Sequence, residues 1–118
     1  MKISTSFYPI RIVEGKPEPV VLTVYLKNNS EKDLLASMLL KIPFSLGFDK
    51  IGLEREKVKR IGTIKAGAEK AIPIMLYPKY NIKEGEYLIK IKVFEHEERY
   101  DKTKAVYEAE TKLRVIKP

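Results

Sequence analysis

Apolar and polar side chains alternate one by one along much of this chain, and this alternation limits the fold more than any other feature. Between Val20 and Asn28, one side of an extended backbone would carry Val20, Leu22, Val24 and Leu26. A period of two is typical of strands that bury one face, whereas an amphipathic helix repeats every three or four residues. The pattern therefore predicts a protein built from strands and excludes a helical bundle.

The same pattern predicts about seven strands separated by polar turns. Pro9 interrupts the first, and because proline is poorly accepted inside a ladder we expect this strand to break or to switch sheets. The segment from Phe44 to Lys57 lacks regular alternation and is open to a short helix or an irregular crossing. The expected strands are 2–13, 20–28, 34–43, 58–64, 69–77, 86–95 and 105–116. Such a series indicates an all-β chain, folded as an Ig-like antiparallel β-sandwich of about seven strands.

Length and composition limit the classes of protein further. The 118 residues fit one domain, 1–118, and the absence of cysteine removes disulfides and thiol chemistry. A charged fraction of 33%, dominated by Lys and Glu, is typical of proteins from hot environments. No apolar run has the length of a signal peptide or of a membrane span, so we expect a cytoplasmic protein. A domain excised from a longer secreted protein would have the same sequence features and would be extracellular.

Three local features carry a resemblance to a known group of domains. They are an apolar strand that ends in Asn28 and Asn29, the turn Gly62 to Gly67, and the sequence Gly85-Glu86-Tyr87. Over about Pro19 to Glu95 the chain resembles the Ig-like modules of bacteria and archaea that are grouped as cell-adhesion-related (CARDB-like) domains or are appended to glycosidases. The resemblance implies a spacer, adhesion or carbohydrate-associated module. Independently, a tyrosine that opens a late strand, as Tyr87 does, can return its hydroxyl to the backbone upstream as a tyrosine corner.

Enzymatic sites are poorly supported by the residues. His96 is the only histidine, so one chain cannot build a multi-histidine metal centre. A Ser-His-acid set would have to combine His96 with one of five serines, and none of these lies in a glycine-flanked elbow. We therefore expect a non-enzymatic protein without a metal or cofactor.

Assigning the outward faces of the strands gives a candidate contact surface. If the third, sixth and seventh strands share a sheet, several apolar side chains face solvent beside a set of lysines, which indicates a partner-binding surface. Its residues are Leu35, Leu39, Leu88, Phe94, Lys90 and Lys92. The expected partner is another protein or a second copy of the chain. A register error of one residue, or a loop 44–57 folded over the patch, would remove this surface. The other sheet is also expected to expose apolar residues, namely Val21, Tyr25, Pro73, Met75 and Tyr77.

A second candidate surface is basic. The net charge is +7, and Arg55, Lys57, Lys59 and Arg60 place four cations within six residues, as a polyanion site requires. Glu54 and Glu56 offset half of that charge, and no aromatic residue is interleaved for base stacking. We therefore expect a solvated basic face, with polyanion binding as the alternative and nucleic acid as a disfavoured partner.

Overall fold

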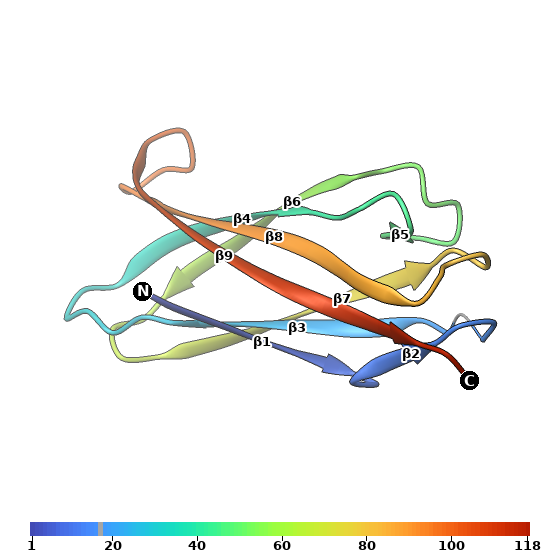
Figure 1. The fold of residues 1–118 in the computed structure, drawn as a ribbon. Coiled ribbons are helices and arrows are strands. Elements are labelled where there is room, and N and C mark those ends of the chain that lie inside the picture. The colour runs from blue at the N-terminus through green and yellow to red at the C-terminus, as the bar shows by residue number, and fades with distance from the viewer. Residues whose placement is uncertain (17) are drawn as a thin grey trace.

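The computed structural model describes residues 1–16 and 18–118, which form nine strands and no helix (Figure 1). The strands are β1 (Lys2–Tyr8), β2 (Arg11–Val13), β3 (Val20–Lys27), β4 (Leu34–Lys41), β5 (Leu46–Gly47), β6 (Glu56–Ile64), β7 (Glu69–Pro78), β8 (Gly85–His96) and β9 (Thr103–Ile116). The all-β prediction is confirmed. Nine strands are present instead of about seven, because the first predicted strand is divided into β1 and β2 and the segment 44–57 contributes β5.

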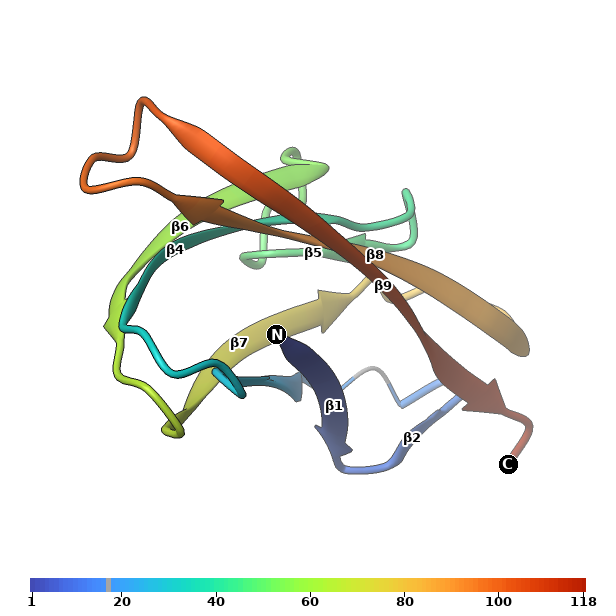
Figure 2. The same cartoon turned by 90° about the vertical axis from the view of Figure 1, so that its left-hand side faces the viewer.

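The strands form two sheets that pack face to face (Figure 2). One sheet has the order β1-β3-β7-β5, and the other has the order β2-β9-β8-β4-β6. Paired neighbours are antiparallel except β2 and β9, which run parallel. The predicted third, sixth and seventh strands correspond to β4, β8 and β9, so they do share a sheet, as the surface prediction assumed.

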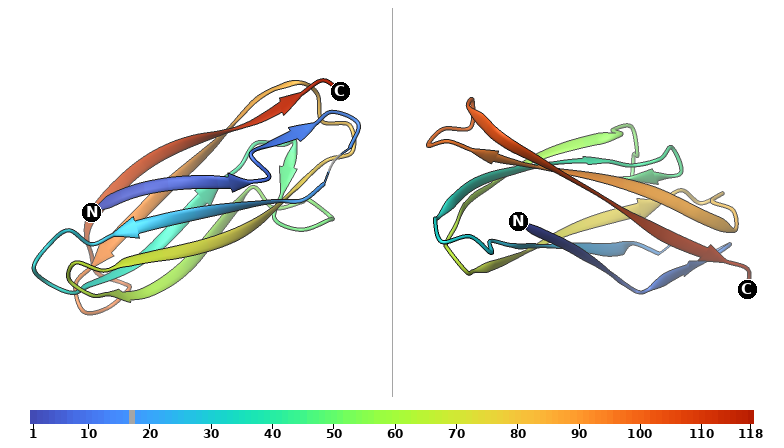
Figure 3. Two further views of the ribbon diagram at one scale, coloured as in Figure 1. Left: turned by 90° about the horizontal axis from the view of Figure 1, so that it is seen from below. Right: turned by 60° about the vertical axis from the view of Figure 1, so that its left-hand side comes forward.

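The chain changes sheets at Pro9, after a cis peptide bond between Tyr8 and Pro9. Before this point β1 pairs with β3, and after it β2 pairs with the end of β9 (Figure 3). The prediction that the first strand breaks or switches sheets is therefore confirmed. One continuous segment of chain thus belongs to both layers and links them along one side of the sandwich.

The hydrophobic core lies between the sheets and is lined by the faces that the alternation predicted. The inward residues of β3, for example, are all fully buried. Burial of one such Leu or Val side chain contributes about 1.5 to 3 kcal/mol. The predicted inward residues that are buried include Val20, Leu22, Val24, Leu26, Ala36, Met38, Leu40, Ile42, Ile72, Ile74, Leu76, Ile89, Ile91, Val93, Leu113 and Val115. The same alternation places Tyr87, Tyr107 and Ala109 on the inward side, and they pack against this core while remaining half-buried.

Pro73 lacks an amide donor, so a bulge or an edge location is expected at its position in β7. It pairs with Thr23 of β3 on one side of β7. The other neighbour, β5, pairs with β7 only at Tyr77 and Pro78. Among the residues described, no strand therefore pairs with the other edge of β7 at Pro73.

The two ends of the sandwich differ. The polar end consists of the turns 28–33, 65–68 and 97–102, near the N-terminus, whereas the loop end consists of the connections 42–55 and 79–84 (Figures 1 and 3). At the loop end the Tyr87 hydroxyl donates a hydrogen bond to the Lys83 carbonyl at 2.6 Å. This is the contact with upstream backbone that the position of Tyr87 predicted.

Candidate interaction surface

The outward side chains of β4, β6, β8 and β9 form the outer face of the five-stranded sheet, and register arranges them in rows across the strands. Ser37 on β4 is opposite Phe94, which is opposite Val106. In the next row Lys92 lies between Leu39 and Glu108. In the row after that, Lys90 lies between Lys41 and Glu110. Because neighbouring strands are about 4.8 Å apart, side chains within a row are direct neighbours.

Apolar side chains gather toward the polar end of this face and form an apolar cluster. Its residues are Leu35, Leu39, Val58, Phe94 and Val106. Leu39 is opposite Val58 of β6, and Val58 is 69% exposed. Val58 was missed from the sequence, because the pairing of β6 with β4 depends on a register that a single strand does not reveal. The register shifts where Ala36 and Ser37 of β4 follow each other, so Ile61 is an extra residue of β6 at a β-bulge.

The predicted surface residues do not form one continuous apolar patch. Leu88 is exposed, but it is separated from Phe94 along β8 by the two outward lysines Lys90 and Lys92. Leu88 is instead opposite Lys112 of β9. The structure therefore brings Leu35, Leu39 and Phe94 together and leaves Leu88 apart, near the loop end.

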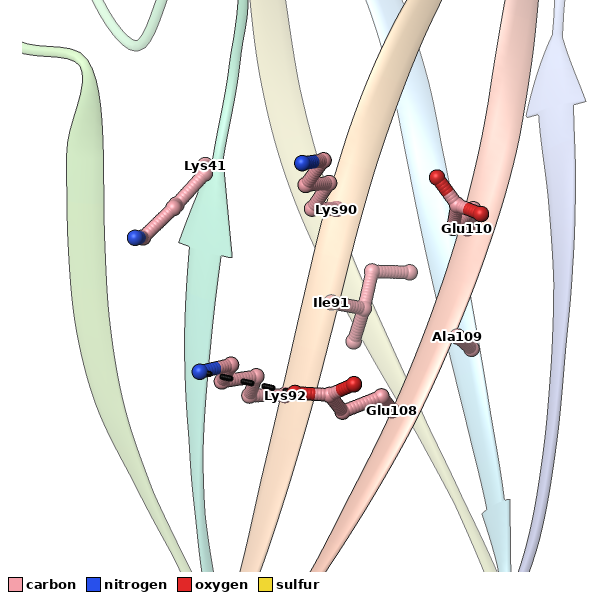
Figure 4. Close-up of a pocket in the computed structure, with 7 residues that line it drawn as sticks. All are labelled: Lys41, Lys90, Ile91, Lys92, Glu108, Ala109 and Glu110. Carbon is pink, nitrogen blue, oxygen red and sulfur yellow. Dashed lines mark ion pairs between the residues drawn. The ribbon is translucent and has the colours of Figure 1, made fainter.

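Between Leu88 and the apolar cluster the face is charged and hollowed. The hollow has a volume of about 750 Å³ and is lined by lysines of β4 and β8 and by glutamates of β9 (Figure 4). Lys92 forms an ion pair with Glu108, at 3.5 Å between Nζ and Oε1. Lys41 pairs with Glu56 at the same distance. Among the residues described, Lys90 and Glu110 form no ion pair, although they are direct neighbours in one row.

The hydroxyl of Ser37 and the ring of His96 meet at the edge of the apolar cluster. Ser37 Oγ lies 2.7 Å from His96 Nε2, and both residues are buried. Nδ1 of the ring lies 3.5 Å from Thr103 Oγ1, and the ring packs edge-on against Tyr100. A Ser-His pair was considered from the sequence. Within 1–16 and 18–118 the ring has a hydroxyl and no carboxylate at Nδ1, so the third member of a catalytic triad is missing.

The structure divides the basic cluster between two sides of β6. Lys57 and Lys59 are opposite Leu40 and Met38, whose side chains point inward, whereas Arg60 is opposite Ser37 on the outer face. The Arg60 guanidinium stacks on Tyr100, 4.6 Å from the ring centroid. Arg55 donates hydrogen bonds from Nη1 to loop carbonyls. The four cations therefore do not present one surface.

The outer face of the four-stranded sheet is much less charged. Tyr8, Val21 and Met75 share one row, and Ser6, Thr23 and Pro73 share the next. The residues predicted to be outward here do lie on this face: Val21, Tyr25 and Tyr77 are half-buried, while Pro73 and Met75 are exposed.

A buried carboxylate lies under the polar end, between the sheets. Oε1 of Glu95 accepts a hydrogen bond from the Tyr107 hydroxyl at 3.2 Å, and Oε2 lies 3.7 Å from Lys104 Nζ. Desolvation raises the pKa of Tyr107, and the charge of Glu95 and this hydrogen bond raise it further. The arrangement is a satisfied polar cluster within the fold. In the described part of the chain, no group of three or more His, Cys, Asp or Glu residues is placed to hold a metal ion.

None of the described residues forms a helix that is long and apolar enough to span a bilayer. Comparison of the sequence with models of known families and with curated protein sequences gives no match.

Proposed function

We propose that this protein is a non-catalytic interaction module with an Ig-like fold, and that it self-associates through the outer face of its five-stranded sheet. The Ig-like assignment is supported by the strand orders, in which β1, β3 and β7 form one sheet and β9, β8, β4 the other. The Tyr87 to Lys83 hydrogen bond, which has the form of a tyrosine corner, supports it as well.

The observation that carries self-association is the charge pattern of the hollow. Lysines occupy β4 and β8, while glutamates occupy the outward positions of β9 beside them. A two-fold axis that runs along the strands, between β8 and β9, exchanges these two columns when a second copy packs face to face. Lys90 of each copy then comes over Glu110 of the other. A two-fold interface must be complementary to itself, and this pattern has that property.

The same axis provides an apolar contact. Phe94 and Val106 are opposite each other on β8 and β9, so the operation brings Phe94 of one copy over Val106 of the second. Aromatic side chains in the middle of an interface contribute most of its binding energy, whereas exposed ion pairs mainly fix the register. The contact of Phe94 with Val106 therefore supplies affinity, and the pair of Lys90 and Glu110 supplies orientation.

Charge reversal tests this proposal directly. Lys90→Glu and Glu110→Lys each place like charges across the interface, and each variant should weaken association about tenfold or more. A mixture of the two variants restores opposite charges in both contacts and should form a mixed dimer. The readout is sedimentation velocity over a range of concentrations, with thermal unfolding to verify the fold.

Lys2→Glu is the matched control, because Lys2 is exposed on β1, in the other sheet. It changes the net charge as Lys90→Glu does and should leave association intact. A wild-type protein that stays monomeric at high concentration would refute the proposal. So would single variants that associate as well as the wild type, or a mixture that associates no better than its components.

A further inference from the structure

The loop end exposes four large apolar or aromatic side chains that neither the core nor the outer face of the five-stranded sheet uses. Phe44, Ile51 and Leu53 belong to the connection 42–55 and Tyr80 to the connection 79–84, and their exposed fractions lie between 72% and 84%. The two connections adjoin each other, because Lys79 Nζ lies 3.4 Å from the centroid of the Phe44 ring. No equally exposed large apolar side chain lies in the three turns of the polar end, all of whose residues are described.

Hydrogen bonds fix the backbone of the two connections that carry these side chains. Nη1 of Arg55 donates to the carbonyls of Gly52 at 2.8 Å and Glu54 at 2.9 Å, and the Asp49 carboxylate accepts from the Gly52 amide at 2.8 Å. Lys79 N donates to the Ser45 carbonyl, which joins the two connections. The same connections bury Leu46 and Ile82. The loops are therefore packed, and Ile51 and Leu53 project from them on either side of Gly52.

Cations accompany the exposed apolar side chains. The Arg55 guanidinium lies 4.7 Å from the Phe44 ring, so two cations flank one aromatic side chain. Neither Arg55 nor Lys79 forms an ion pair with a carboxylate among the residues described. The pKa of Lys79 is lowered by desolvation and by the nearby charge of Arg55, and an anion bound beside both cations would offset their repulsion. Over 42–59 and 79–84 the sequence has six cations and four carboxylates.

We propose that the loop end docks onto the surface of an anionic lipid bilayer, with Phe44, Ile51, Leu53 and Tyr80 entering the interface and Arg55 and Lys79 contacting lipid phosphates. Apolar side chains on projecting loops can enter the boundary between headgroups and acyl chains without a matching groove. Aromatic rings and long basic side chains are suited to the same depth, because their apolar parts lie among the chains while their polar parts reach the headgroups. Cations near an anionic surface add attraction that salt screens.

Vesicle binding tests the proposal. The wild type should co-sediment with vesicles of phosphatidylcholine mixed with phosphatidylglycerol, more weakly with phosphatidylcholine alone, and less as salt is raised. The double variant Ile51→Glu with Leu53→Glu should lose about tenfold or more of this binding, since it removes two apolar contacts and adds two negative charges. Ala71→Glu with Met75→Glu makes the same charge change on the exposed side of β7 and should bind like the wild type. Lys79→Gln should lower the affinity for anionic vesicles about fivefold, and Lys65→Gln, at the polar end, should lower it much less.

A fluorescence measurement locates the contact. The chain has no tryptophan, so Tyr80→Trp introduces a single one at the loop end, and Ala66→Trp introduces one at the polar end. The emission of the first should shift to shorter wavelength on addition of anionic vesicles, while that of the second stays unchanged. Equal shifts, no binding to anionic vesicles at low salt, or full binding by the Ile51 and Leu53 double variant would each overturn the proposal. Retention on heparin without binding to vesicles would also overturn it, in favour of a soluble polyanion.

Discussion

The two ends of the sandwich, where the chain crosses between strands and sheets, carry opposite kinds of side chain. At the polar end the side chain of Asn28 is fully buried and joins the turn 28–33 to the end of β6. Its Nδ2 donates to the carbonyls of Lys32 and Ile64 at 2.7 and 2.9 Å, and its Oδ1 accepts from the amide and hydroxyl of Ser30. At the loop end, large apolar side chains are exposed, and hydrogen bonds of Arg55 and Tyr87 to backbone carbonyls hold the chain.

This difference indicates that the polar end contributes more to the stability of the fold, whereas the loop end carries the proposed contact with a bilayer. A buried amide that uses all its groups contributes to folding and is costly to change, because its partners would be left without hydrogen bonds. Exposed apolar side chains contribute little to folding, so their retention on ordered loops needs another reason. Substitutions in the turns of the polar end should therefore reduce stability most, and substitutions at the loop end should most reduce the proposed binding to a lipid bilayer.

The largest effect on stability should come from Asn28→Ala. It removes the hydrogen bonds that the side chain makes to the carbonyls of Lys32 and Ile64 and from the amide of Ser30, and should destabilise the fold by about 2 to 4 kcal/mol. The midpoint of thermal unfolding should fall by roughly 10 °C. Asn29→Ala, at the exposed neighbouring residue, is the matched control and should change the midpoint by little. Similar midpoints for the two variants would contradict the view that Asn28 holds the polar end.

A smaller effect is expected at the loop end from Tyr87→Phe. The change removes only the hydroxyl that donates to the Lys83 carbonyl, and should cost about 1 kcal/mol in denaturant unfolding. Tyr80→Phe removes the hydroxyl of an 84% exposed ring and should cost nothing measurable. If Tyr87→Phe destabilises the protein as much as Asn28→Ala, the two ends contribute equally to stability and the contrast between them fails.

The inward faces of the strands were predictable from the sequence, whereas the grouping of side chains on the outer faces was not. In β3, β4 and β8 the strict period of two identifies the buried residues, because a slip of one position would expose the whole apolar set. That argument needs only one strand at a time. It gives no information on which outward residues become neighbours, so Leu88 and Phe94 were grouped although Lys90 and Lys92 separate them. The contact of Leu39 with Val58 depends on the register of β6 and was not visible either.

Contacts between residues far apart in the chain were likewise not predicted from the sequence. The pairing of Ser37 with His96 joins residues 59 positions apart in the chain. Ser37 lay in the expected strand 34–43, whereas His96 lay just beyond the end of the expected strand 86–95. Tyr87 could be predicted, since its partner Lys83 lies four residues upstream and the contact is local. The exposed side chains of Ile51 and Leu53 lie in a segment without periodicity, so the pattern did not assign them to the core or to the solvent.

The smallest effect, and the one that tests the buried chemistry of the polar end, concerns Tyr107 at high pH. Its pKa is raised in the folded protein above the usual value of about 10, first by desolvation and then by Glu95. A group with a raised pKa stabilises the fold fully below its unfolded pKa and loses that contribution as pH rises through the folded value. Unfolding free energies of the wild type and Tyr107→Phe should therefore converge between about pH 9 and about pH 12. A constant difference over that range would show that the fold does not raise the pKa of Tyr107.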